Sequence, residues 1–255
     1  TLILYLKMPT KKFDILKVKD KSDSYYKQKD RIFDLSFRLI INGKSFLAGK
    51  TSLILNLILR DKYYKNDYDG SNIFIVSNNK LDNKIRILMI EKSIPKANYM
   101  KYDESELEIL YDQLEQEAMD EVNANKKMTH KLIIFDDVAS SGNLKNKQAG
   151  IMSTFFMNGR HANISCCVTS QKFSLLGANL RSNCTGAILF NTSQKELELI
   201  AEDFNYMEKK SQFMKMFRDI AGREKHSFLC VNFSNPRNEL YLDKNFEPID
   251  ESKYL

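Results

Sequence analysis

The chain has 255 residues and a formal net charge of +6, with 43% hydrophobic and 28% charged residues; this is ordinary for a globular protein of one large domain, with or without a small appendage. No stretch approaches the roughly 18 apolar residues that a membrane-spanning helix requires, and the 4 cysteines and 3 histidines lack metal-ligand spacing, which excludes a His/Cys metal centre. The positive charge permits a nucleic-acid partner without establishing one.

Strands and helices alternate along most of the chain. Residues 1–34 are basic and weakly patterned, which indicates an arm or small subdomain ahead of one domain at 35–255. In chain order, we expect a strand at 37–41, a helix at 51–62, a strand at 73–76, a helix at 81–92, a possible strand at 98–102, a helix at 105–123, a strand at 132–136, a helix at 148–159, a strand at 164–169, a short helix or loop at 173–181, a strand at 187–190, helices at 195–204 and 209–221, and a hairpin of 228–231 with 239–242. This order favours an α/β fold whose mostly parallel sheet is sandwiched by helices, with a C-terminal hairpin. The helix at 51–62 is apolar on nearly all faces, so we expect it to be buried.

A phosphate-binding turn is predicted where the first strand meets its helix. Gly49, Lys50 and Thr51 match the end of the G-x-x-x-x-G-K-[S/T] pattern, but the first glycine position falls on Lys44, and Gly43 stands one residue too early. In this interpretation Lys50 meets the β- and γ-phosphates and Thr51 holds Mg²⁺. The alternative is a turn that merely begins a buried helix.

Two adjacent carboxylates end the strand at 132–136. Asp136 and Asp137 follow four apolar residues, so the strand would deliver both acids to the carboxyl edge of the sheet, where open α/β folds bind ligands. Asp136 would bind Mg²⁺, and Asp137 would polarise the attacking water as general base. The alternative is that an aspartate caps the following turn.

Three further polar residues could act on a phosphoryl group. Gln171 follows the strand at 164–169 and could sense the γ-phosphate. Arg160 or Arg181 could stabilise the transferred phosphoryl group from a neighbouring subunit. The alternatives are a glutamine satisfied by loop backbone and arginines in surface salt bridges.

Five segments in one order and spacing resemble the FtsK–HerA superfamily of DNA-pumping ATPases. They are residues 49–51, 133–137, 159–165, 170–171 and 180–183. Within that superfamily the chain is most similar to the genome-packaging ATPases of poxviruses, other large DNA viruses and virophages, over about residues 35 to 235. The Arg-His step before the strand at 164–169 and the glutamine after it are more specific than the phosphate loop.

The resemblance implies a RecA-like P-loop NTPase core that forms a homo-oligomeric ring, often a hexamer. It implies hydrolysis of ATP with Mg²⁺ at subunit interfaces and translocation of double-stranded DNA into a capsid. The implied partners are capsid portal or vertex proteins, with no membrane. The implied location is the host cytoplasm, at a viral factory, or the virion. The residues that carry over are Gly49, Lys50, Thr51 and Ser52 for the nucleotide, Thr51 and Asp136 for Mg²⁺, and Asp137, Gln171 and either Arg160 or Arg181 for catalysis.

Three features bear on DNA binding and on the alternative functions. The loop at 140–147, with Lys145 and Lys147, could line a central channel and contact DNA phosphates without sequence preference. A second basic zone at 209–225 is either a DNA surface or an ordinary solvated face. The irregular phosphate loop also leaves open a nucleotide-binding structural protein with little hydrolysis, and a single-strand helicase remains a third hypothesis.

Overall fold

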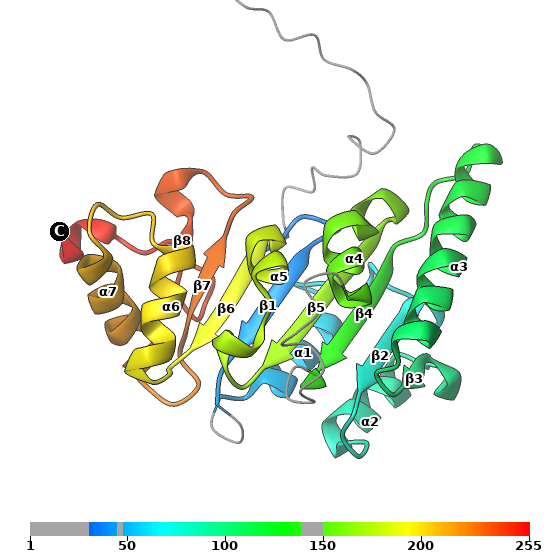
Figure 1. Cartoon of the computed structure of the whole chain (residues 1–255), viewed down its shortest axis with the longest axis horizontal. Helices are drawn as coiled ribbons and strands as arrows, with labels where there is room; N and C mark the ends of the chain where they lie inside the picture. Colours follow the sequence, from blue (N-terminus) through cyan, green and yellow to red (C-terminus); the bar gives the residue numbers. More distant parts are fainter. Residues whose placement is uncertain (1–30, 45–47, 139–149) are drawn as a thin grey trace, which may run out of the picture.

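Eight strands form one sheet in the order β3-β2-β4-β5-β1-β6-β7-β8 (Figure 1). The computed structural model describes residues 31–44, 48–138 and 150–255. The strands are β1 (Arg38–Asn42), β2 (Ile73–Ser77), β3 (Tyr99–Met100), β4 (Lys131–Asp136), β5 (Ile164–Ser170), β6 (Gly186–Phe190), β7 (Phe228–Asn232) and β8 (Tyr241–Leu242). The first six strands run parallel, whereas β7 pairs antiparallel with β6 and β8 antiparallel with β7. The predicted mostly parallel sheet with a C-terminal hairpin is therefore confirmed.

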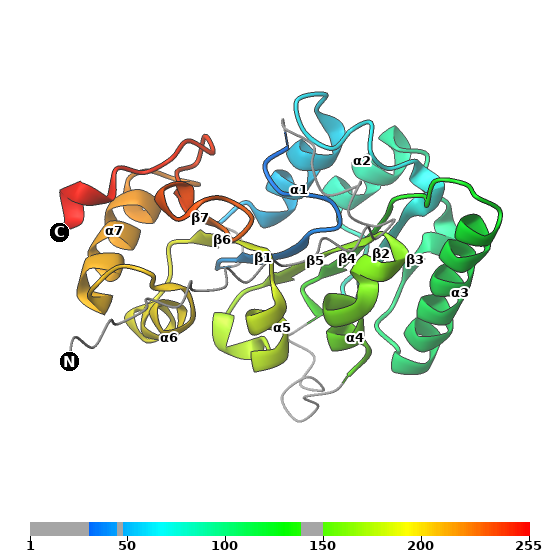
Figure 2. The same ribbon diagram turned by 90° about the horizontal axis from the view of Figure 1, so that it is seen from above.

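Helices cover both faces of this sheet. They are α1 (Lys50–Leu59), α2 (Asn83–Glu91), α3 (Glu104–Asn123), α4 (Ile151–Asn158), α5 (Ala178–Asn183), α6 (Gln194–Phe204) and α7 (Lys210–Gly222). Figure 2 shows α1 and α2 on one face and α3, α4, α5 and α6 on the other. The buried side chains accordingly form two clusters, one under each helix layer, with α7 contributing to the cluster of α3 to α6. This is the expected sandwich of a sheet between helices.

The central strands read as continuous apolar runs because both of their faces are covered. All seven residues of β5 are buried, as are the first five residues of β4. Strand β5 lies between β4 and β1, and the register pairs Phe135 with Val168 and Asn42 with Ser170. The carboxyl ends of these three strands therefore meet at one edge of the sheet.

Helix α1 is less buried than its composition predicts. Ile54, Leu57 and Ile58 are buried and face the sheet, whereas Leu53 and Leu55 are only partly covered by the described residues. The expectation of a helix buried on nearly all faces is wrong in this respect, because α1 lies in an outer layer and packs on the sheet through one stripe of side chains.

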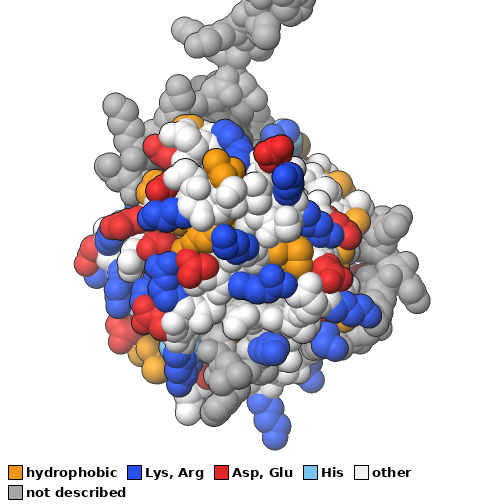
Figure 3. All heavy atoms as spheres, turned by 90° about the vertical axis from the view of Figure 1, so that its left-hand side faces the viewer, with side chains coloured by type: hydrophobic (Ala, Val, Ile, Leu, Met, Phe, Trp, Pro, Cys, Tyr) orange, Lys and Arg blue, Asp and Glu red, His pale blue; other side chains and the backbone are white. Residues whose placement is uncertain are grey.

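The end of the sheet that carries α7 presents a mixed surface. Figure 3 shows basic side chains on this side interspersed with acidic ones. Several of them are paired, since Lys210 lies 3.1 Å from Glu202 and Arg223 lies 3.0 Å from Asp219. The basic zone at 209–225 thus contains ion pairs of the kind found on an ordinary solvated face.

Some of the sequence predictions fall outside the described residues. Residues 1–30, most of the predicted basic arm, are among them, as are the centre of the phosphate loop at 45–47 and the predicted channel loop with Lys145 and Lys147. Phe33 and Leu35, just after the first of these segments, pack into the core beneath α1 and α2. Across the part of the chain that is described, no helix combines the length and apolarity needed to span a bilayer.

Candidate nucleotide-binding and catalytic site

The phosphate loop ends in a left-handed glycine. Gly49 has φ 81° and stands at the N-cap of α1, where it has no side chain of its own to cap the helix start. A helix N-terminus directs backbone N–H groups and the positive end of the helix dipole outward, which suits an anion. The Lys50 ammonium donates a 2.8 Å hydrogen bond to the Gly43 carbonyl oxygen, so it spans the loop from end to end.

The early position of Gly43 has a packing explanation. A Cβ at this residue would lie 2.6 Å from the Ala48 Cβ and 2.8 Å from the Phe190 Cβ, distances that real side chains essentially never show. Its N–H also donates to the Ser170 carbonyl oxygen at 3.0 Å. Gly43 is therefore required where the two ends of the loop close against β6.

The two aspartates are held by the neighbouring strand. The Thr169 hydroxyl donates to Asp136 Oδ1 at 2.9 Å and accepts a 2.9 Å hydrogen bond from the Asp137 backbone N–H. Asp137 has φ 55°, an uncommon conformation that Asp tolerates better than most residues. The Gln171 amide donates to Asp137 Oδ2 at 2.6 Å. The structure thus brings together three of the residues predicted for metal binding and catalysis.

Burial perturbs the charges at this site. Burial raises the pKa of Asp136, the hydrogen bond from Thr169 opposes the rise, and the Asp137 carboxylate adds to it. Burial lowers the pKa of the Lys50 ammonium, while the two aspartates act in the opposite direction. Two adjacent acids and a lysine that share a partly desolvated site are a common mark of function.

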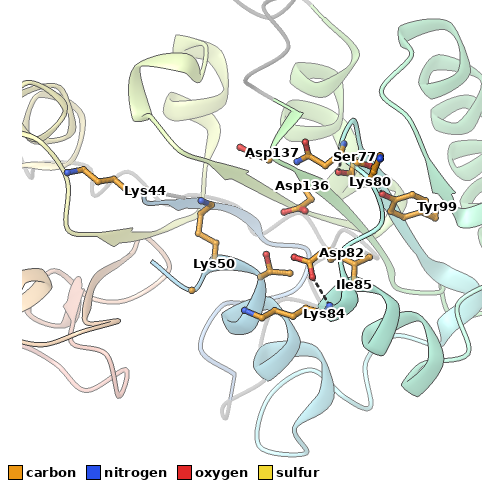
Figure 4. A pocket seen from close by; sticks show the side chains of 13 residues that line it. Lys44, Lys50, Ser77, Lys80, Asp82, Lys84, Ile85, Tyr99, Asp136 and Asp137 are labelled. Atoms are coloured by element: carbon orange, nitrogen blue, oxygen red, sulfur yellow. Dashed lines mark hydrogen bonds between the residues drawn. The ribbon is translucent and has the colours of Figure 1, made fainter. Parts of the chain in front are cut away.

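These groups open onto a cavity of about 440 Å³, within the range of small-molecule sites. Its lining includes Lys50, Thr51, Asp136 and Asp137, with Lys80 and Lys84 farther along (Figure 4). The described residues hold no group of three or more His, Cys, Asp or Glu suited to a metal. Mg²⁺ needs no such group when one hydroxyl, one carboxylate, phosphate oxygens and water complete its shell. The donors Thr51 and Asp136 fit that role.

The structure adds contacts that the sequence analysis missed. Thr169 joins the two acids, and its only signal in the sequence is a hydroxyl near the end of an apolar strand. The Lys84 ammonium donates to Ser52 Oγ at 2.8 Å, so the hydroxyl predicted to meet nucleotide is engaged from α2. Asp82 caps α2 by accepting from the Lys84 backbone N–H at 2.8 Å, and it lines the same cavity.

The two candidate arginines lie away from this cavity. Arg160 belongs to the turn Gly159–Ala162 that leads into β5, and Arg181 belongs to α5, which leads into β6. Both therefore lie toward the amino ends of parallel strands whose carboxyl ends carry the acids. Arg160 is exposed, with Nε 3.4 Å from His161 Nε2, whereas Arg181 forms a 2.9 Å ion pair with Asp203.

Solved structures of viral packaging proteins share this fold. The genome packaging NTPase B204 from Sulfolobus turreted icosahedral virus 2, in complex with sulfate, is 14% identical with a TM-score of 0.56, over 86% of this chain and 99% of that one. Its complex with ATP-gammaS is 13% identical with a TM-score of 0.56, over 84% and 98% of the two chains. B204, the DNA-packaging ATPase from Sulfolobus Turreted Icosahedral Virus, is 15% identical with a TM-score of 0.54, over 85% and 99%.

At these identities the likeness establishes the fold, which is that of P-loop ATPases. No curated protein sequence matches the chain. A family model does: residues 25–235 match the model described as Poxvirus A32 protein. This confirms the family expected from the five sequence motifs. The chain therefore belongs to the poxvirus A32 protein family.

Proposed function

We propose that this chain is an ATP- and Mg²⁺-dependent motor that translocates double-stranded DNA into a viral capsid. One observation carries the proposal: Lys50, Asp136 and Asp137 converge on one cavity beside the N-terminus of α1. Membership of the poxvirus A32 family and the likeness to B204, described as a genome packaging NTPase, support the packaging role. The proposal extends to a homo-oligomeric ring that docks on capsid portal or vertex proteins and acts in the host cytoplasm or the virion.

The described side chains can divide the work of hydrolysis. The Lys50 ammonium exchanges the Gly43 carbonyl for oxygens of the β- and γ-phosphates. Thr51 and Asp136 would hold Mg²⁺, which would supply neutralisation of phosphate charge. Asp137 orients the attacking water and accepts its proton, as general-base catalysis requires.

Gln171 positions the catalytic carboxylate. Its amide donates a hydrogen bond to Asp137 Oδ2 at 2.6 Å and so fixes the orientation of the carboxylate that accepts the proton from water. Gln171 follows β5, which lies between β4, the strand that ends in the acids, and β1, the strand that leads into the phosphate loop. A movement of the acids or of the phosphate loop can therefore be transmitted to Gln171. This is the arrangement that a sensor of phosphate release needs.

Arg160 is the arginine we assign to catalysis across a subunit interface. It is exposed and lies at the amino edge of the sheet, so it faces away from its own nucleotide site. Arg181 is engaged by Asp203 at 2.9 Å and its guanidinium lies 5.3 Å from the centre of the Phe173 ring, which suits a structural role. A guanidinium supplied by a neighbouring subunit stabilises charge on the transferred phosphoryl group.

The first experiment measures ATP turnover with and without duplex DNA for the natural chain, Lys50→Ala and Asp137→Asn. We expect turnover that DNA stimulates in the natural chain, no turnover in Lys50→Ala, and retained ATP binding with turnover reduced about 10²- to 10⁴-fold in Asp137→Asn. Absence of turnover in the natural chain with DNA present would favour the structural protein. Displacement of a paired strand, without displacement of a triplex strand from duplex DNA, would favour the helicase.

The second experiment tests the arginine by mixing inactive chains. The Arg160→Ala chain keeps an intact nucleotide site, and the Asp137→Asn chain keeps an intact arginine. In an equimolar mixture, about one interface in four therefore combines the site of an Arg160→Ala chain with the arginine of an Asp137→Asn chain. We expect the mixture to recover turnover that neither variant shows alone. Arg181→Ala is the matched control. Recovery with Arg181→Ala, and none with Arg160→Ala, would reverse the assignment.

A further inference from the structure

A second cavity of about 380 Å³ borders the described ends of the phosphate loop at Lys44 and Ala48. It is lined by the end of β6, with Phe190 and Asn191, and by the turn between α7 and β7, with His226. Lys44 lines both this cavity and the one that holds the aspartates. The described ends of the phosphate loop therefore border both cavities, with Gly49 and Lys50 lining the first and Ala48 lining the second.

The sheet order gives a bound nucleotide its direction. The acids stand at the end of β4, the loop follows β1, and the second cavity lies at β6 and β7, in the sheet order β4-β5-β1-β6-β7. Figure 4 shows Asp136 on one side of Lys50 and Lys44 extending on the other. A triphosphate whose terminal phosphate meets the acids crosses the loop, so its nucleoside end leaves toward β6 and β7.

We propose that the second cavity is the nucleoside subsite, where Asn191 and His226 contact the base and ribose of the nucleotide. This inference rests on the proposed function, because it takes the triphosphate to bind between Lys50 and the acids. The Asn191 amide offers both a donor and an acceptor for a base edge or a ribose hydroxyl. The imidazole offers an aromatic face on which a base can stack.

His226 lies against the end of the phosphate loop. A Cβ at Gly49 would lie 3.2 Å from His226 Nδ1, and that nitrogen lies 3.4 Å from the Ala48 carbonyl oxygen. His226 itself has φ 67°, a left-handed conformation that is uncommon for residues other than glycine. Such outliers cluster at ligand sites, because surrounding structure must hold them. The ring is thus set beside the point where the phosphates would turn toward the cavity.

Two features favour this cavity over the far end of the first one. Its floor includes Ala221 and the buried Phe190, so it offers apolar surface to a base. The second feature is the contact of His226 with Gly49 at the start of α1, whereas Tyr99 at the far end of the first cavity bonds through its hydroxyl to the Asn79 carbonyl oxygen at 3.1 Å. Both cavities carry ammonium groups, from Lys80 and Lys84 in the first and from Lys44 and Lys225 in the second, so charge does not distinguish them.

The test compares the affinity for ATP with that for inorganic triphosphate, which has no nucleoside, each with Mg²⁺. The natural chain, His226→Gly, Asn191→Ala, Tyr99→Ala and the surface control Gln116→Ala are measured by calorimetry, with thermal unfolding as the check of folding. Glycine removes the ring and accepts the left-handed backbone. We expect His226→Gly and Asn191→Ala to bind ATP about tenfold more weakly and inorganic triphosphate within about twofold of the natural chain.

Three results would overturn the inference. The first is natural ATP affinity in both His226→Gly and Asn191→Ala. The second is a selective loss of ATP affinity in Tyr99→Ala alone, which places the base at the far end of the first cavity. The third is an equal loss of both ligands in His226→Gly, with no effect in Asn191→Ala, which makes the ring a support of the loop. A natural chain that binds neither ligand would refute the proposed function itself.

Discussion

The Thr169 hydroxyl is the contact on which the geometry of both acids depends, and Thr169→Val removes it while keeping the side-chain shape. Thr169 is fully buried, and its hydroxyl serves the Asp136 carboxylate and the Asp137 N–H, each at 2.9 Å. Loss of a hydrogen bond to a charged group costs about 1.5–3 kcal/mol, and a buried N–H left without a partner costs about 1–3 kcal/mol. We expect the free energy of unfolding to fall by about 3 kcal/mol at neutral pH.

The pH dependence gives this prediction a second signature. Burial already raises the pKa of Asp136 and the Thr169 hydroxyl opposes the rise, so the valine variant raises that pKa further. A carboxyl whose pKa is raised by folding favours the fold below that pKa and disfavours it as the pH rises through it. The stability difference between the variant and the natural chain should therefore shrink in acid, and the acid limb of Mg²⁺-dependent turnover should move to higher pH.

The assay is urea unfolding from acid to neutral pH, paired with a Mg²⁺ titration of turnover. Thr169→Ser is the matched control, because it keeps the hydroxyl and loses only a methyl group. It should retain the acid limb of the natural chain. A valine variant within about 0.5 kcal/mol of the natural chain at neutral pH, with an unmoved acid limb, would show that the two hydrogen bonds do not hold the acids.

Two other substitutions test the site from its edges. Gln171→Glu replaces a 2.6 Å hydrogen bond to Asp137 with repulsion between two carboxylates. Turnover should fall about 10²-fold or more, while the ATP affinity measured by calorimetry stays unchanged. Unchanged turnover would show that the contact plays no part in catalysis. Gly49→Ala imposes φ 81° on an L-residue and brings a methyl group within 3.2 Å of His226. The free energy of unfolding should fall by about 1–2 kcal/mol, and inorganic triphosphate should bind more weakly. Unchanged stability in urea would show that the loop relaxes to accept the methyl group.

The fold and the central residues could be predicted because they depend on short segments of sequence. An apolar run that ends in Asp136 and Asp137 predicts a buried parallel strand with its acids at the ligand edge, and β4 has this form. Gly49 before an apolar helix predicts a phosphate turn, and the left-handed glycine stands there. Alternation of strands and helices predicts the parallel sheet, whose crossovers follow from chain length and handedness.

The contacts that hold the site could not be predicted because they join distant segments. The hydrogen bond from Thr169 to Asp136 links residues 33 apart in sequence, and it exists only because β5 lies beside β4 in one register. The placement of His226 against Gly49 depends on the turn after α7 reaching back across the sheet edge. The partial exposure of α1 likewise follows from its place in an outer layer, which composition does not specify.

The parallel sheet also separates the two halves of the proposed chemistry. Every strand from β1 to β6 points the same way, so groups after a strand gather at one edge and groups before a strand gather at the other. Asp136, Asp137 and Gln171 follow their strands, whereas Arg160 precedes β5. A single chain cannot bring this arginine to its own phosphates without unfolding the turn that leads into β5. A head-to-tail arrangement that sets the amino edge of one chain against the carboxyl edge of the next would join them, and the proposed ring is the closed form of such heterologous contacts.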